Sequence, residues 1–113
     1  MLFNPEITVW LYQGQVDMRK QINGLSILVS SNMNKNPTNG ELFIFFNKNT
    51  DKIKMLYWDR NGFCLWYKRL EKARFKVPKD KATLNYEQLR WLLDGLDLND
   101  LQGYQKLSYT KFF

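Results

Sequence analysis

The sequence predicts an α+β domain with a mainly antiparallel sheet of about four strands and two helices packed on one face. Three observations support this fold class. Short segments are rich in alternating aromatic and β-branched residues, one segment has an apolar stripe at helical period, and turn residues separate the strand-like segments. The expected order is β-α-β-β-β-α, and its consecutive hairpins make the sheet antiparallel. The 113 residues suffice for one domain, which we place at residues 1–98, followed by a C-terminal tail at 99–113, disordered or docked.

The first part of the chain predicts one strand and one long helix. Residues 7–12 are alternating and β-branched or aromatic, which indicates a strand that ends at the glutamines around Gly14. Asp17 is placed to cap a helix that extends to about residue 33. The helix has an apolar stripe formed by Met18, Ile22, Leu25 and Val29.

A loop over residues 34–40 leads into the strand-rich middle of the chain. Three strands of a meander are expected there, over residues 42–47, 53–58 and 63–70. The dipeptide Asn61-Gly62 is a strong hairpin signal between two β-rich segments. Residues 74–77 either extend the third of these strands or form a short fourth one.

The last predicted element is a helix over residues 86–94. Asn85 is suited to the N-cap, and Gln88 three residues later completes a capping box. Leu84 and Leu89 occupy the positions of a hydrophobic staple, and Gly95 marks the end of the helix.

Positive charge is concentrated in the middle of the chain. The net charge is +6, and residues 41–82 carry eleven basic and five acidic side chains, whereas residues 1–40 have a net charge of +1 and residues 83–113 of −1. A charge concentrated in this way attracts polyanions. We therefore expect DNA as the main partner.

Catalytic and cofactor-binding patterns are missing from the sequence. Histidine is absent, and Cys64 is the one cysteine, which excludes the usual nucleophile pairs and zinc sites. Carboxylates such as Asp51 and Asp59 could in principle hold Mg²⁺, but they lie in expected turns, where solubility explains them. We expect a protein that is not an enzyme and uses no cofactor or metal.

The location of the protein is expected to be cytoplasmic. A single cysteine suits a reducing compartment, and the N-terminus has no signal-peptide pattern. The apolar runs are too short to span a bilayer, so no membrane partner is expected.

Candidate contacts with nucleic acid are the basic residues and the two tryptophans of the strand-rich region, together with a basic pair near the first helix. They are Arg19, Lys20, Lys54, Trp58, Trp66, Lys68, Arg69, Lys72, Arg74 and Lys76. Basic groups bind phosphates while aromatic rings meet bases or sugars. The alternative is that the aromatic residues belong to the core and the lysines to a solvated face.

The neighbours Lys68 and Arg69 are expected to have different roles. Alternation along a strand sends them to opposite faces of the sheet. We predict that one contacts DNA and that the other is paired with Glu71 or Asp59 within the fold.

Several segments together carry a family resemblance. They are Val9-Trp10-Leu11, Asp17-Met18-Arg19-Lys20 and, longest, the run from Lys52 to Glu71 that contains Tyr57-Trp58-Asp59-Arg60-Asn61-Gly62. The chain resembles the accessory proteins of insertion sequence family sixty-six, the short second-frame product called TnpB. The resemblance covers residues 7 to about 97.

The resemblance implies a bacterial protein encoded by a mobile element beside a separate, larger transposase. Such a protein assists transposition and does not cut DNA itself. Two interpretations of its role follow. In the first it binds DNA, at the ends of the mobile element, through its basic strand-rich face. In the second it is an adaptor that docks on the transposase or on a second copy of itself through aromatic surface and an open sheet edge.

Overall fold

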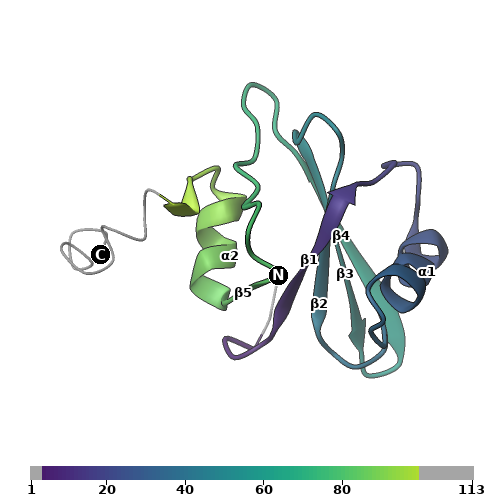
Figure 1. Ribbon diagram of the computed structural model, residues 1–113. Helices are drawn as coiled ribbons and strands as arrows, with labels where there is room; N and C mark the ends of the chain where they lie inside the picture. Colours follow the sequence, from purple (N-terminus) through teal and green to yellow (C-terminus); the bar gives the residue numbers. More distant parts are fainter. Residues whose placement is uncertain (1–3, 100–113) are drawn as a thin grey trace.

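A five-stranded sheet with two helices forms the protein in the computed structural model, which describes residues 4–99 (Figure 1). The elements are β1 (Val9–Gln15), α1 (Ile22–Asn32), β2 (Leu42–Phe46), β3 (Lys52–Asp59), β4 (Gly62–Arg69), β5 (Thr83–Leu84) and α2 (Tyr86–Leu93). The α+β class and the predicted order are confirmed, with one additional short strand. The expected tail, apart from Asn99, lies outside the described residues. Within residues 4–99, no helix is long and apolar enough to cross a membrane.

The strands lie in the order β4-β3-β2-β1-β5. Strands β1 and β2 are parallel, because α1 connects them as a crossover, and all other neighbouring pairs are antiparallel. The predicted strand at residues 74–77 is irregular chain instead. Strand β5, which the sequence did not indicate, pairs with β1 through only two residues.

The two helices lie on opposite faces of the sheet, so the prediction that both pack on one face is wrong. Leu25 and Val29 of α1 pack with Phe43 and Phe45 of β2. The alternate residues of β2, with Ile44 among them, form the other core with Leu89 and Leu92 of α2. All five residues of β2 are buried, and a strand that is apolar on both faces needs cover on both. Figure 1 shows one helix on each side of the strands.

Strand β1 extends beyond its expected end and α1 begins later than expected. The β1–β2 register shifts between Leu11 and Gln15, and Gly14 has a φ of +111° there. The irregularity lets the strand continue through Gln13 and Gly14 to Gln15. Helix α1 has Gln21 at its N-cap without a side-chain cap. Asp17 therefore does not cap this helix, and it organises the preceding turn instead.

The expected signals around α2 are confirmed. Asn85 Oδ1 accepts a hydrogen bond from the Gln88 amide at 2.8 Å, and Gln88 Oε1 accepts one from the Asn85 amide at 3.0 Å. Gly95 follows the helix with a φ of +82°, a conformation that favours glycine. The hairpin between β3 and β4 is also confirmed, although its two turn residues are Arg60 and Asn61.

The connection from β4 to β5, residues 70–82, is anchored to the turn between β2 and β3. The Leu70 amide donates to the Asp51 carbonyl at 2.8 Å, and the Phe75 amide donates to the Thr50 carbonyl at 2.7 Å. The Phe75 side chain is buried, with its ring 5.7 Å from that of Phe46. The connection thus lacks regular structure but is fixed at two points.

Candidate nucleic-acid interface

Three loops meet at the end of the sheet where β1, β2 and β4 end and β3 begins. The strand register places Gln15 beside Phe46, Phe46 beside Ile53, and Ile53 beside Lys68. The loops and the residues next to them are 16–21, 47–52 and 69–81, which we call the basic end. They contain ten basic and four acidic residues, a net charge of +6. The remainder of residues 4–99 carries five basic and six acidic residues, a net of −1.

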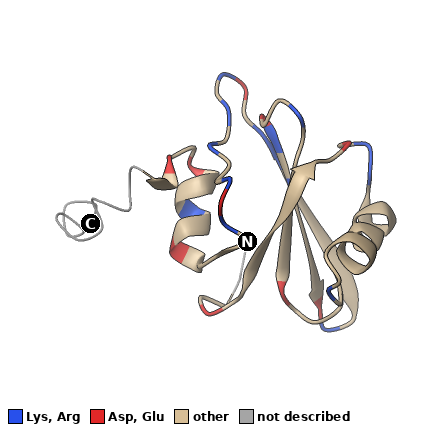
Figure 2. Ribbon diagram, viewed as in Figure 1, with Lys and Arg blue, Asp and Glu red and all other residues tan. Residues whose placement is uncertain are grey.

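The basic residues of this end come from all three loops, and Figure 2 shows blue segments in the loops at the top of the molecule. They are Arg19, Lys20, Lys48, Lys52, Arg69, Lys72, Arg74, Lys76, Lys79 and Lys81. In the longest loop the buried residues Phe75 and Pro78 alternate with exposed cations, so the anchors of the loop hold its charges outward. Four further residues belong to this end although they were not among the predicted contacts: Lys48, Lys52, Lys79 and Lys81.

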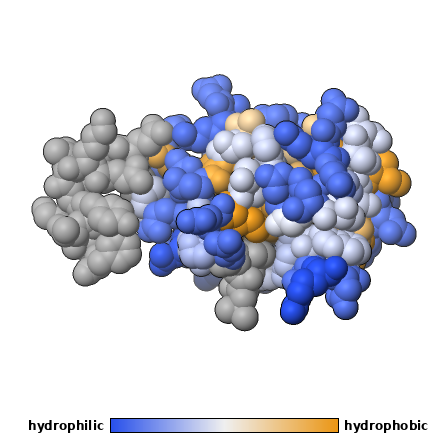
Figure 3. Space-filling model, turned by 90° about the horizontal axis from the view of Figure 1, so that it is seen from below, coloured by the Kyte–Doolittle hydropathy of each residue, from blue (hydrophilic) through white to orange (hydrophobic). Residues whose placement is uncertain are grey.

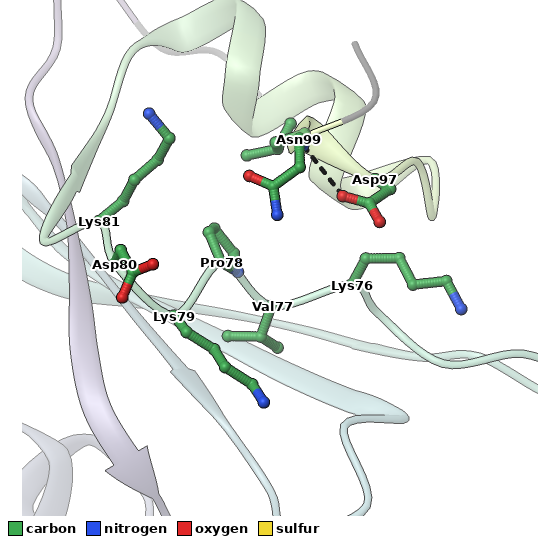
Figure 4. A pocket seen from close by; sticks show the side chains of 9 residues that line it. Lys76, Val77, Pro78, Lys79, Asp80, Lys81, Asp97 and Asn99 are labelled. Atoms are coloured by element: carbon green, nitrogen blue, oxygen red, sulfur yellow. Dashed lines mark hydrogen bonds between the residues drawn. The ribbon is translucent and has the colours of Figure 1, made fainter. Parts of the chain in front are cut away.

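A hollow of about 520 Å³ lies beside the longest loop, between residues 76–81 and 97–99. Figure 4 shows that the side chains of Lys76, Lys79 and Lys81 extend away from one another. The carboxylates of Asp80 and Asp97 line the same hollow. The lysines therefore do not converge on one small anion, and their spread suits an extended polyanion.

The turn before α1 is tightly organised around Asp17. The Asp17 carboxylate accepts hydrogen bonds from the Arg19 amide at 2.9 Å and from the Arg19 guanidinium at 2.6 Å. These bonds from Arg19 lower the pKa of Asp17 to about 2. The Arg19 side chain nevertheless stays 92% exposed, and Lys20 is exposed beside it. The turn presents two cations to solvent.

Lys54, a predicted contact, is buried. Its side chain leaves β3 beneath the turn and donates hydrogen bonds to the carbonyls of Met18 and Lys20, both at 2.8 Å. The residue is only 6% exposed, and burial lowers the pKa of its ammonium. The structure therefore does not place Lys54 on the surface as the prediction required, because its ammonium donates to the chain itself.

Lys68 and Arg69 have different environments, as expected for neighbours on a strand. The Lys68 ammonium donates to the carbonyl of Leu93 at 2.9 Å, at the C-terminus of α2, where a cation is favourable. Arg69 is exposed, and its guanidinium donates to Glu71 at 3.1 Å. Both residues thus have a partner within the fold: Lys68 is held by a backbone carbonyl, and Arg69, the exposed residue of the two, is the one paired with Glu71.

The two predicted tryptophans do not lie at the basic end as free rings. Trp58 packs edge-on against Phe63, with ring centroids 5.0 Å apart, next to the hairpin at the opposite end of the sheet. Trp66 packs against the core beneath α2. The exposed aromatic residue of this region is Tyr67, which sequence analysis did not select. The alternation of β4 separates Tyr67 from Trp66, but no local signal shows which of the two faces is left uncovered.

The predicted contact set thus divides into two groups. Arg19, Lys20, Arg69, Lys72, Arg74 and Lys76 are exposed at the basic end. Lys54, Lys68, Trp58 and Trp66 are involved in packing or internal hydrogen bonds. Within residues 4–99, no three His, Cys, Asp or Glu side chains gather to hold a metal ion.

Comparison with known proteins places the chain in a family. Two proteins of Sinorhizobium fredii (strain NBRC 101917 / NGR234) are similar to it. Uncharacterized protein y4hO is 33% identical over 94 residues, covering 80% of this chain and 82% of that protein. Uncharacterized protein y4jC is 39% identical over 85 residues, covering 73% of each. No solved structure matches the chain.

The model of one family, described as IS66 Orf2 like protein, matches residues 7–103. This range includes all three loops of the basic end, and the resemblance noted in the sequence is confirmed by it. The family is one of insertion-sequence accessory proteins and is not a known catalytic family. The chain belongs to the IS66 Orf2-like family of transposition accessory proteins.

Proposed function

We propose that this accessory protein binds DNA through the basic end of its sheet. One observation carries the proposal: three loops with a net charge of +6 meet at one end of a molecule whose remaining described residues have a net charge of −1. Such a polarised charge steers a polyanion to one side of the protein. The expected target is the ends of the mobile element.

The form of the basic end favours contacts to phosphates along a strand or duplex. Its cations come from loops anchored by Asp17, Thr50 and Phe75, so little order has to be gained on binding. The diverging lysines of the longest loop match spaced phosphates better than a single small anion. Phosphate contacts fix position and supply affinity without reading sequence.

A salt-dependent titration tests this function. The protein is titrated with a duplex of the element's terminal repeats and with a random duplex of equal length, between 50 and 200 mM salt. If about four to six phosphates are neutralised, log K falls with log salt at a slope of about −4 to −5. A flat salt response, or no binding in low salt, would sink the proposal. A difference between the two duplexes measures sequence specificity.

The protein is expected to bind without cutting. With Mg²⁺ or Mn²⁺, the purified protein should neither nick nor join DNA that carries the element's ends. Metal-dependent cleavage that disappears in Asp59→Ala would contradict this expectation.

The adaptor role receives less support from the surface. The exposed large apolar side chains Ile27, Tyr67 and Leu96 come from three separate segments. Seen from the end opposite the basic one, the hydrophobic residues form small separate patches among hydrophilic ones (Figure 3). If the titration shows no DNA binding, direct binding to the purified transposase is the next measurement.

A further inference from the structure

Tyr67 is unusual among the aromatic residues of this protein. It is 48% exposed, whereas each of the other aromatic side chains in residues 4–99 is buried or half-buried. Aromatic rings in a small domain are normally used in its core. Tyr67 lies on edge strand β4, close to the basic end.

Cations lie near this ring on its own face of the sheet. Lys54 lies opposite Tyr67 in the register, with its ammonium 5.6 Å from the ring centroid. The same ammonium donates hydrogen bonds to the carbonyls of Met18 and Lys20. The turn that contains exposed Arg19 therefore lies close to the ring. Arg69 follows Tyr67 two residues later on the same face, about 7 Å along the strand.

An exposed ring beside cationic side chains is the arrangement with which proteins bind single-stranded nucleic acids. Every base has a π-face that can stack on an aromatic side chain, and the neighbouring cations bind the backbone. In a duplex these faces are covered by adjacent base pairs. A ring on the surface of a sheet can therefore stack only on a base that is unpaired or splayed out.

We propose that Tyr67 is a stacking platform for an unpaired nucleobase of DNA, with the flanking phosphates bound by Arg19, Lys20 and Arg69. The proposal rests on the proposed function and adds a preference for DNA with a single-stranded segment. Lys54 is a positioning residue in this site, because it fixes the turn that carries Arg19 without being accessible itself.

The test compares two fluorescently labelled probes at fixed salt: a blunt duplex, and the same duplex with a short single-stranded overhang. The wild-type protein is expected to bind the overhang probe more tightly. Tyr67→Thr, which keeps a residue favourable in a strand, should weaken binding of the overhang probe at least about fivefold and leave the blunt probe unchanged. Tyr67→Phe keeps the ring and should retain the preference.

A matched control is Tyr86→Thr, which removes a half-buried tyrosine of α2 outside the basic end. It should change neither probe. Equal binding of both probes by the wild-type protein, or equal weakening of both by Tyr67→Thr, overturns the stacking platform while the DNA-binding function stands. If the wild-type protein binds neither probe in low salt, both proposals fail. Thermal melting of each variant confirms that it is folded.

Discussion

At the scale of single residues, whether a basic side chain is buried or exposed depends on the face of the sheet to which its strand position directs it. Lys54 and Lys68 both leave the sheet toward backbone carbonyls, of Lys20 and Leu93 for example, and become parts of the fold. Arg69 points to the other face from Lys68 and remains exposed. All three residues contribute equally to the net charge, but only Arg69, which is paired with Glu71, is exposed to solvent.

Replacing Lys54 by methionine should remove a pH dependence of stability. Burial lowers the pKa of Lys54 in the folded protein, so between this lowered pKa and the normal lysine pKa the unfolded chain binds more protons. Stability from this group therefore rises with pH in that window. Urea unfolding at a series of alkaline pH values measures this rise in the free energy of unfolding. In Lys54→Met the rise should be absent. Lys54→Arg, which cannot lose its charge in this range, should also lack it.

The same Lys54→Met variant should loosen the turn at residues 17–20. Two hydrogen bonds at 2.8 Å to the turn are lost, so backbone amides there, including that of Lys20, should exchange with solvent faster. Hydrogen exchange measures this without DNA. Unchanged exchange would show that Asp17 and Arg19 alone order the turn.

Alanine at Lys68 and at Arg69 should affect different properties. Lys68→Ala loses a half-buried hydrogen bond to the C-terminus of α2 and should lower the melting temperature by a few degrees. Arg69→Ala should lower DNA affinity by about 1 kcal/mol with little change in melting. Melting curves and titrations at fixed salt distinguish the two. If neither substitution changes melting or affinity, the basic end is only a solvated face, and the adaptor role replaces DNA binding as the proposal.

At the scale of elements, the irregular connection at residues 70–82 contributes most to the candidate site. A regular strand would send successive side chains to alternate faces. The connection instead buries Phe75 and Pro78, which are three residues apart, and leaves Arg74, Lys76 and Lys79 exposed. Its two backbone hydrogen bonds to the β2–β3 turn replace those of a sheet. A fixed loop can therefore expose more of its charged side chains than a strand of the same length with one covered face.

Removing two charges from this loop should change the salt dependence by a definite amount. In Lys72→Gln/Lys76→Gln, two phosphate contacts are lost and the slope of log K against log salt should become about 2 less negative. The matched control is Arg60→Gln/Arg90→Gln, which removes the same charge outside the basic end. If both double variants change the slope equally, only the net charge matters and the basic end is not the contact surface.

At the scale of the whole molecule, the sheet separates two cores that share β2. Leu25 of α1 packs on one face and Leu89 of α2 on the other, and neither is exposed to solvent. Because adjacent residues of β2 belong to different cores, loss of either core removes half the cover of the central strand. The two faces should therefore unfold together.

Leu25→Ala and Leu89→Ala should each lower the free energy of unfolding by about 2–5 kcal/mol, as expected for a truncated buried leucine. In both variants, the denaturant transitions followed by tryptophan fluorescence and by far-ultraviolet circular dichroism should coincide. Transitions that separate in one variant would show that its helix unfolds independently of the sheet.

The sequence by itself determined the features that depend on neighbouring residues. The capping box at Asn85 and the hairpin after Asp59 were predictable because caps and tight turns are set within a few residues. The family and the concentration of positive charge in the middle of the chain could also be recognised from the sequence. Only the tertiary structure decided that the helices cover opposite faces, that Lys54 is buried and that Tyr67 is exposed. These outcomes depend on which distant segment covers each face of the sheet, and local periodicity contains no information about that partner.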